Sequence, residues 1–112
     1  MNNIGLTENE ITLIKNVISS SKATKAVIFG SRAKGNFQKN SDIDIALFGN
    51  VTAMEAEEVA MRLELLPLPF MFDVQSFNGI NNAKLKEHIV RVGKTLFEST
   101  ENNTGGRLMP KS

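Results

Sequence analysis

The segment from residue 25 to residue 48 constrains the fold most strongly, because it joins two strand patterns through a turn and a polar loop. Lys25–Phe29 is a short run of β-branched and aromatic residues that stops at Gly30, which is typical of a buried strand. From residue 43 to residue 47 an apolar side chain returns at every second position, the period of a strand with one buried face. We therefore expect a strand, a turn with room for one helical turn, a polar loop and a second strand.

Two capping boxes predict helices on either side of this segment. Thr7 and Glu10 have the spacing at which each side chain satisfies a backbone amide of the other, and Thr52 and Glu55 repeat it. Apolar residues recur at helical spacing behind each box. We expect one helix to begin after each threonine.

The segment from residue 67 to residue 98 predicts a strand, a helix and an edge strand. The prolines at 67 and 69 preclude continuation of the second helix and hold the chain extended. Phe70–Gln75 is then predicted as a third strand. An asparagine at position 81 or 82 can cap a helix that runs to about Val92, and Lys94–Glu98 can add a short edge strand.

This order of elements predicts one α/β (α+β) domain, a small mixed sheet flanked by helices, over residues 1–98. Residues 99–112 are polar and glycine-bearing, and we expect them to form a disordered tail. The chain of 112 residues has no cysteine, no membrane-length apolar run and no basic, apolar start of the secretory kind. We therefore expect a cytoplasmic protein. The formal net charge of +1 favours no nucleic-acid partner.

Three methionines and one apolar stretch concern packing rather than chemistry. Met54, Met61 and Met71 are expected to fill gaps in the core. The stretch from 65 to 70 is apolar and proline-bearing, so any exposed part of it would form a surface for a partner or for self-association.

Asp42 and Asp44 are the strongest candidates for chemistry. They are two residues apart on a predicted strand, so both carboxylates project from the face opposite the buried isoleucines. Their repulsion would be relieved by a divalent cation, and hard oxygen ligands suit Mg²⁺, which shares its remaining positions with water and substrate phosphates. Asp73 interrupts an apolar strand and is the natural third carboxylate for a site with two metal ions.

The Gly30-Ser31 turn is the candidate phosphate site. Glycine allows close approach of the backbone, and the exposed amides with the Ser31 hydroxyl can hold phosphate oxygens. Arg32 and Lys34 add cationic groups that could meet a triphosphate. The order of residues is that of neither a P-loop nor a dinucleotide fingerprint.

Each of these features also has a plain structural explanation. An Asp-x-Asp pair is more often a solvated strand face, and a Gly-Ser pair is more often an ordinary turn. Asp73 could pair with a lysine, and Arg32 and Lys34 could belong to a solvated loop. The joint arrangement of strand, Gly-Ser turn, loop, Asp-x-Asp strand, helix and strand with a lone aspartate favours the functional interpretation.

That arrangement resembles a known family. Phe29–Gly35 followed by Ser41–Leu47 is similar to the signature of the DNA polymerase β-like nucleotidyltransferase superfamily, in particular its minimal nucleotidyltransferase (MNT) branch. The resemblance covers the chain from the first predicted helix to about Glu98 and departs at Lys34, where relatives often have arginine. It implies a nucleotidyltransferase fold and transfer of a nucleoside monophosphate from a nucleoside triphosphate to an acceptor hydroxyl, with release of pyrophosphate.

The resemblance also implies roles for residues. Asp42 and Asp44 would bind two Mg²⁺ ions, and Asp73 would assist as the third metal ligand and activate the acceptor. Gly30 and Ser31 would hold the triphosphate of ATP or another nucleotide, a role for which Arg32 and Lys34 are candidates on charge alone.

Small MNT proteins typically pair with a helical HEPN-domain toxin, and the resemblance therefore implies an antitoxin. One expectation is an enzyme, a protein adenylyltransferase that transfers AMP to a hydroxyl of the HEPN partner. The short chain has no added acceptor-binding domain, so the partner would supply that hydroxyl. The alternative is an inactive nucleotide-binding antitoxin that neutralises its partner by complex formation. Assembly with itself or with a second chain stays open.

Overall fold

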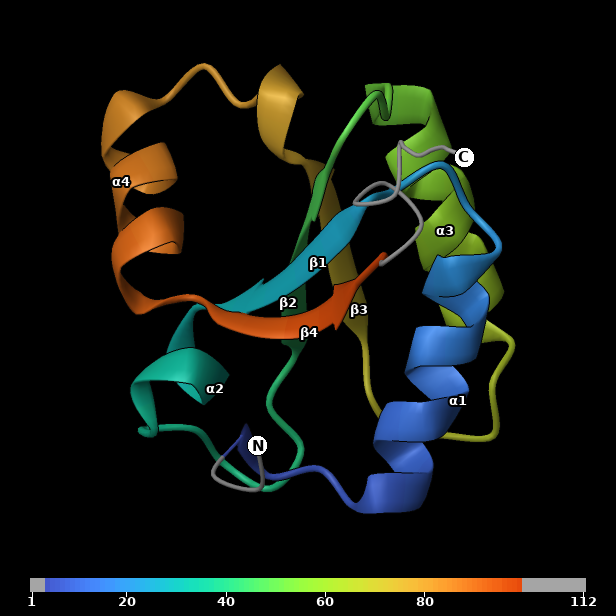
Figure 1. Ribbon diagram of the computed structural model, residues 1–112. Coiled ribbons are helices and arrows are strands. Elements are labelled where there is room, and N and C mark those ends of the chain that lie inside the picture. Colours follow the sequence, from blue (N-terminus) through green and yellow to red (C-terminus); the bar gives the residue numbers. More distant parts are fainter. Residues whose placement is uncertain (1–3, 100–112) are drawn as a thin grey trace.

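The computed structural model describes residues 4–99, which form a four-stranded sheet in the order β3-β2-β1-β4 with helices on both faces (Figure 1). The strands are β1 Lys25–Phe29, β2 Ile43–Phe48, β3 Phe72–Ser76 and β4 Lys94–Glu98. The helices are α1 Glu8–Ser19, α2 Ser31–Lys34, α3 Ala53–Glu64, the 3-10 turn η2 Phe77–Gly79 and α4 Ala83–Val92. The predicted fold class is confirmed. None of the helices in the described ranges has the length and apolar character that a membrane crossing requires.

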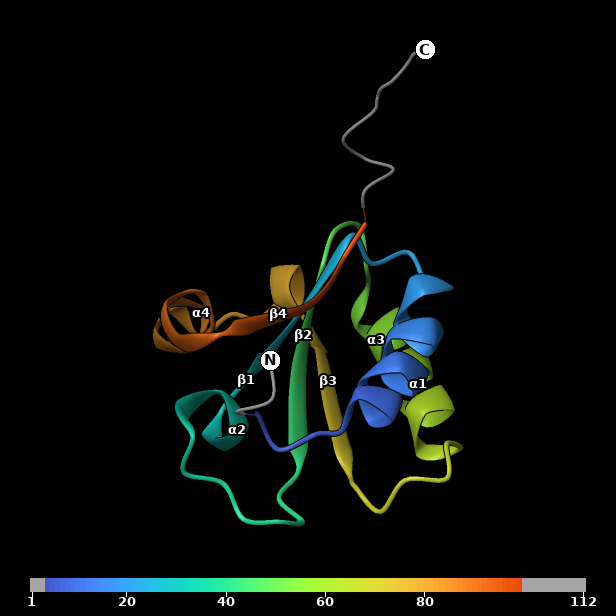
Figure 2. The ribbon, with the colours of Figure 1, turned by 60° about the horizontal axis from the view of Figure 1, so that its bottom comes forward.

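The sheet is mixed. β1 pairs with β2 and with β4 in antiparallel fashion, whereas β2 pairs with β3 in parallel. A parallel pair needs a crossover, and α3 supplies it between β2 and β3. Figure 2 shows α1 and α3 on one side of the sheet and α4 on the other.

Alternation along the strands divides the apolar side chains between two clusters. The larger cluster lies between the sheet and the helices α1 and α3, and its strand members include Ile28, Ile43, Ile45, Leu47 and Val74. The smaller cluster lies under α4, around Val27, Phe29 and Ile89. Burial of each apolar side chain contributes about 1.5–3 kcal/mol before the entropy of ordering is subtracted.

Both predicted capping boxes are present. The Thr7 hydroxyl accepts from the Glu10 amide at 3.1 Å, and a Glu10 carboxylate oxygen accepts from the Thr7 amide at 2.9 Å. Thr52 and Glu55 repeat these two bonds at 3.1 and 2.9 Å. The two boxes therefore set the starts of α1 and α3, as the sequence predicted.

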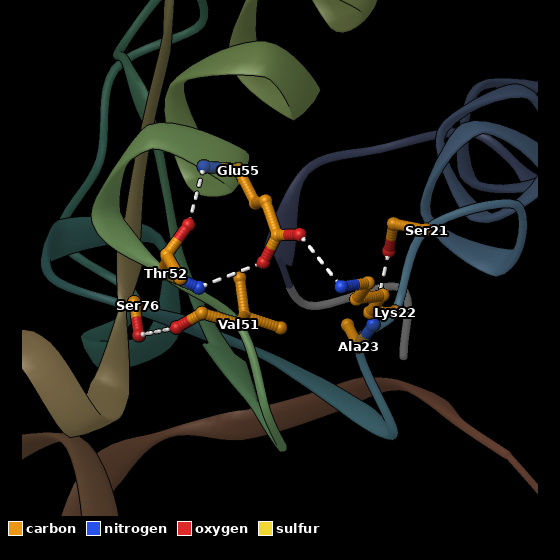
Figure 3. A network of polar contacts seen from close by, with 7 residues as sticks. All are labelled: Ser21, Lys22, Ala23, Val51, Thr52, Glu55 and Ser76. Carbon is orange, nitrogen blue, oxygen red and sulfur yellow. Dashed lines mark hydrogen bonds and ion pairs between the residues drawn. The ribbon is translucent and has the colours of Figure 1, made fainter.

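A polar network joins the end of α1 to the start of α3 (Figure 3). Lys22 Nζ lies 3.1 Å from a Glu55 carboxylate oxygen, and the other Glu55 oxygen accepts from the Thr52 amide. At the end of β3 the buried Ser76 hydroxyl donates to the Val51 carbonyl. At this end of the sheet, where β1 begins and β2 and β3 end, these polar groups are thus paired with one another.

The positions of three methionines differ from the prediction. Met54, Met61 and Met71 are 79%, 68% and 64% exposed. Met54 and Met61 are seven residues apart and share the outer face of α3, because other side chains of that helix form its inward stripe. Leu65 is 84% exposed, so part of the apolar stretch from 65 to 70 does face solvent.

One strand boundary also differs. β3 begins two residues later than predicted, and the Phe70 ring, which precedes it, packs on the Arg32 guanidinium. In the predicted tail from 99 to 112, the Ser99 amide donates to the Thr24 carbonyl at 2.8 Å. The rest of that tail lies outside the described residues.

Candidate active site

Three carboxylates are brought to one end of one face of the sheet. Asp44 of β2 lies opposite Asp73 of β3 in the parallel register and opposite Phe29 of β1 in the antiparallel register. The strand neighbours of both aspartates are buried in the larger cluster, so the two carboxylates project from the other face of the sheet. Asp42 lies one residue before β2 and is exposed. The convergence expected for these residues depended on β2 and β3 being neighbours, which they are.

The electrostatics of this cluster single out Asp44. Asp44 is half-buried, whereas Asp42 and Asp73 are exposed. Burial raises the pKa of the Asp44 carboxyl to about 6, and the negative charges of Asp73 and Asp42 add to the shift. Within residues 4–99 the one ion pair joins Lys22 to Glu55, so no cation of this part of the chain neutralises the three carboxylates.

The donor set fits a hard divalent cation held in an open site. Among the described residues no group of three or more acidic, histidine or cysteine side chains lies in a position to hold a metal ion by itself. Mg²⁺ does not require such a group, because it keeps several waters and is commonly bound through one or two carboxylates together with substrate phosphates. Burial is the largest cause of the raised pKa of Asp44, the negative charges of Asp73 and Asp42 add to it, and a cation at this position would offset these effects.

Gly30 lies directly against the Asp44 carboxylate. Its φ of +77° favours glycine, and a Cβ atom built there would collide with Asp44 Oδ2. Gly30 also precedes α2 without a side-chain cap, so the amides of the first turn have no side-chain acceptor. Ser31 is the first residue of α2 and is half-buried. The turn and the carboxylates thus form one site.

Of the two predicted cationic contacts, only Lys34 is exposed. Arg32 is 1% exposed, and its five hydrogen bonds all go to main-chain carbonyls. Burial lowers the pKa of its guanidinium, an effect that Glu10 opposes. The structure therefore gives Arg32 a place inside the protein, different from the triphosphate contact predicted for it.

Sequence reasoning missed the surroundings of Arg32. The rings of Phe37 and Phe70 have their centroids 5.1 and 4.9 Å from the guanidinium carbon. The signal in the sequence was slight: one phenylalanine in an otherwise polar loop and one after two prolines. Their meeting over one arginine depends on the tertiary fold.

A mixed sheet that sets paired carboxylates beside a Gly-Ser turn and a short helix defines the class of nucleotidyl-transferring domains. The chain belongs to the family described as "Polymerase beta, Nucleotidyltransferase", whose model matches residues 9–102. The comparison with curated proteins gives no significant match.

Several solved structures are similar over most of the chain. A toxin–antitoxin crystal structure with AMP-PNP is 25% identical, with a TM-score of 0.67, over 88% of this chain and 78% of that chain. A toxin–antitoxin structure named MntA-HepT is 21% identical, with a TM-score of 0.64, over 87% and 77%. A complex of a tri-AMPylated Shewanella oneidensis HEPN toxin with an MNT antitoxin is 22% identical, with a TM-score of 0.56, over 83% and 76%.

Proposed function

We propose that this chain is an Mg²⁺-dependent nucleotidyltransferase that transfers AMP from ATP to a hydroxyl of a HEPN-domain partner and acts as its antitoxin. The observation that carries the proposal is the strand register that places Asp44 beside Asp73, with Gly30 packed against the Asp44 carboxylate. This puts acidic ligands and a turn suited to phosphate at the same end of the sheet.

The residues present account for the steps of such a transfer. The acceptor oxygen attacks the α-phosphorus of the nucleotide, and the bond from that phosphorus to the oxygen bridging to the β-phosphate breaks, which releases pyrophosphate. Asp73 is exposed and can accept the proton that the hydroxyl loses. Asp42 and Asp44 would hold Mg²⁺, and Asp73 would complete the ligand set of a second ion. When bound, Mg²⁺ neutralises charge on the phosphates and orients them.

The Gly-Ser turn and Lys34 would hold the triphosphate in this scheme. Backbone amides at a glycine-bearing turn bind phosphate oxygens without side-chain crowding. Lys34 is exposed on α2, one helical turn from Gly30. Arg32 is left out of the triphosphate contacts, because its donors are already used by carbonyl oxygens.

The similar structures support the choice of nucleotide and partner. The structure that is 25% identical contains AMP-PNP in a toxin–antitoxin assembly. The HEPN toxin in another similar structure is AMPylated. The exposure of Asp42 and Asp73 leaves room for a hydroxyl from a second protein to approach the carboxylates.

The test is transfer of label from each of the four nucleoside triphosphates to a purified candidate HEPN partner, with Mg²⁺ present. We expect transfer from ATP, and a loss of at least about 100-fold in Asp44→Asn, because removal of a charged group from such a site costs that much. Glu57→Gln is the matched control, since it removes one negative charge from the exposed surface of α3. Equal transfer by Asp44→Asn and the control would contradict the proposal.

The second candidate is the inactive nucleotide-binding antitoxin, which would neutralise its HEPN partner by complex formation. It predicts that an Asp42→Asn, Asp44→Asn double variant still binds the HEPN partner and still protects cells that express it. A variant that binds the partner but no longer protects would exclude this candidate and leave catalysis as the means of protection.

A further inference from the structure

Arg32 is the one charged side chain that the described residues bury, and its guanidinium is fully used. Nη1 donates to the carbonyls of Ile4 at 2.9 Å and Gly5 at 3.5 Å. Nη2 donates to Lys39 at 3.3 Å and Ser41 at 2.9 Å, and Nε donates to Ser41 at 3.3 Å. The planar fork thus joins the N-terminal segment to the loop between α2 and β2.

Close packing surrounds this fork. The Phe37 and Phe70 rings lie against the guanidinium, a cation–π arrangement that desolvates it at moderate cost. Gly5 has a φ of +81°, and a Cβ atom there would collide with the Phe37 ring and lie 2.9 Å from Arg32 Nη1. We call this group the Arg32 cluster: Arg32, Gly5, Phe37, Phe70 and the carbonyls of the hydrogen bonds above.

The Arg32 cluster is connected to each part of the candidate site. Ser41, which accepts two of the bonds, directly precedes Asp42. Arg32 itself follows Ser31, and Phe70 lies three residues before Asp73. One side chain therefore links the segments that carry the Gly-Ser turn, the first carboxylate and the third.

A buried charge needs a reason, because its desolvation is costly and an apolar side chain would fill the same space at a lower cost. The loop has its own turn, in which the Ser41 amide donates to the Gln38 carbonyl, yet the bonds from Arg32 attach that turn to the rest of the protein. Only a guanidinium offers five donors in a rigid plane, so lysine cannot make these bonds together.

We infer that Arg32 is a positioning residue that holds Asp42 in place beside the Gly-Ser turn by fastening the Ser41 carbonyl. This inference rests on the proposed function and assigns within it a residue that touches neither nucleotide nor metal ion. Loss of Arg32 should raise the Mg²⁺ concentration that the protein requires by about 10–100-fold, the effect of removing a group that orients a metal ligand.

The experiment compares Arg32→Lys with the wild type in two measurements that need no turnover. The first is the Mg²⁺ concentration that half-saturates binding of AMP-PNP, and the second is hydrogen exchange of the backbone amides from 37 to 42. We expect the Mg²⁺ requirement and the loop exchange each to rise by about tenfold or more, while AMP-PNP affinity at saturating Mg²⁺ stays near that of the wild type.

Ile18→Val is the control for general destabilisation, because Ile18 is fully buried in the larger cluster and lies in α1. It should lower the melting temperature and leave the Mg²⁺ requirement unchanged. If Arg32→Lys does not fold, Phe37→Leu takes its place, since it keeps every hydrogen bond of Arg32 and loosens only the ring contact. It should raise the Mg²⁺ requirement by about threefold, less than the loss of an orienting bond.

Two results would overturn the inference. One is a folded Arg32→Lys variant with the Mg²⁺ requirement and loop exchange of the wild type. The other is a loss of AMP-PNP affinity that excess Mg²⁺ does not restore, with unchanged loop exchange, which would mean direct contact with phosphate. If the wild type transfers no label to the HEPN protein, the proposed function fails, but loop exchange and the Mg²⁺ titration still decide the role of Arg32.

Discussion

The two ends of the sheet differ in how their carboxylates are compensated. At the end where β1 begins, the Glu55 carboxylate is bonded to the Thr52 amide and paired with Lys22. The hydrogen bond from the Thr52 amide, and then the one from Lys22, lower the pKa of Glu55. At the end where β1 stops, Asp44 is crowded by Asp73 and Asp42, and burial with these like charges raises its pKa to about 6.

The difference shows which end holds the molecule together and which end is available for binding. Compensated charge stabilises the native state by itself, whereas like charges held together by the backbone store an unfavourable interaction until a cation arrives. The sheet tolerates the like charges around Asp44 because the two core clusters pack on strands β1 and β2 from opposite faces.

Among variants that keep all three carboxylates, the largest expected effect comes from a methyl group placed beside Asp44. Gly30→Ala forces a residue with a side chain into a φ of +77° and drives its Cβ into the Asp44 carboxylate. We expect transfer of AMP to fall by about 100-fold, since a displacement of about 1 Å near reacting groups has that effect. Transfer assays at saturating ATP measure it.

Gly35→Ala is the matched control for backbone strain. Gly35 has a similar φ of +86°, but a Cβ atom there has nothing within 4 Å. It should cost about 1–2 kcal/mol of unfolding free energy, as left-handed backbone does for residues with a Cβ, and leave transfer largely intact. Equal losses of activity in the two variants would mean that strain alone, rather than contact with Asp44, explains Gly30.

A smaller effect is expected from pH at Asp44. Its folded-state pKa, about 6, lies above the unfolded value of 3.8, so the folded state binds the proton more tightly. The stability contributed in this way is fully present below about pH 4 and is lost as the pH rises through 6. Because Asp44 is half-buried, we discount the shift for solvent screening and expect no more than about 1 kcal/mol.

Urea unfolding of metal-free protein at pH 4.5 and pH 7 measures this effect. Asp44→Asn should lose that component of the pH dependence and unfold at slightly higher urea than the wild type at pH 7. Added Mg²⁺ should stabilise the wild type more at pH 7 than at pH 5, because the ion and the proton compete for the carboxylate. A pH dependence that is the same in Asp44→Asn would show that folding does not raise the pKa of Asp44.

The smallest effect is expected at the paired end. Glu55→Gln removes the ion pair with Lys22, which is solvent-exposed, and keeps an oxygen that can accept from the Thr52 amide. We expect a slight fall in melting temperature, largest at low salt, and no change in transfer of AMP. A large fall would mean that the network in Figure 3 contributes more than exposed pairs usually do.

Most of the local structure was predictable because its signals lie within a few residues of each other. The two capping boxes placed the starts of α1 and α3, and alternation of apolar residues placed β2 with its aspartates on the outer face. The methionines of α3 were placed wrongly, since apolar character alone does not say which face of a helix the core will use. The burial of Arg32 was missed because its partners, such as the Ile4 carbonyl and the Phe70 ring, lie far from it in the sequence.

By itself, the sequence determined the elements, the Gly-Ser turn and the pair Asp42 and Asp44, because spacing along one strand decides which side chains share a face. Only the tertiary structure decided that β3 lies parallel to β2, which sets Asp73 beside Asp44. It alone decided that Arg32 turns inward, where carbonyls from two distant segments meet. Contacts between residues far apart in the chain depend on how strands and loops pack, and no local pattern encodes them.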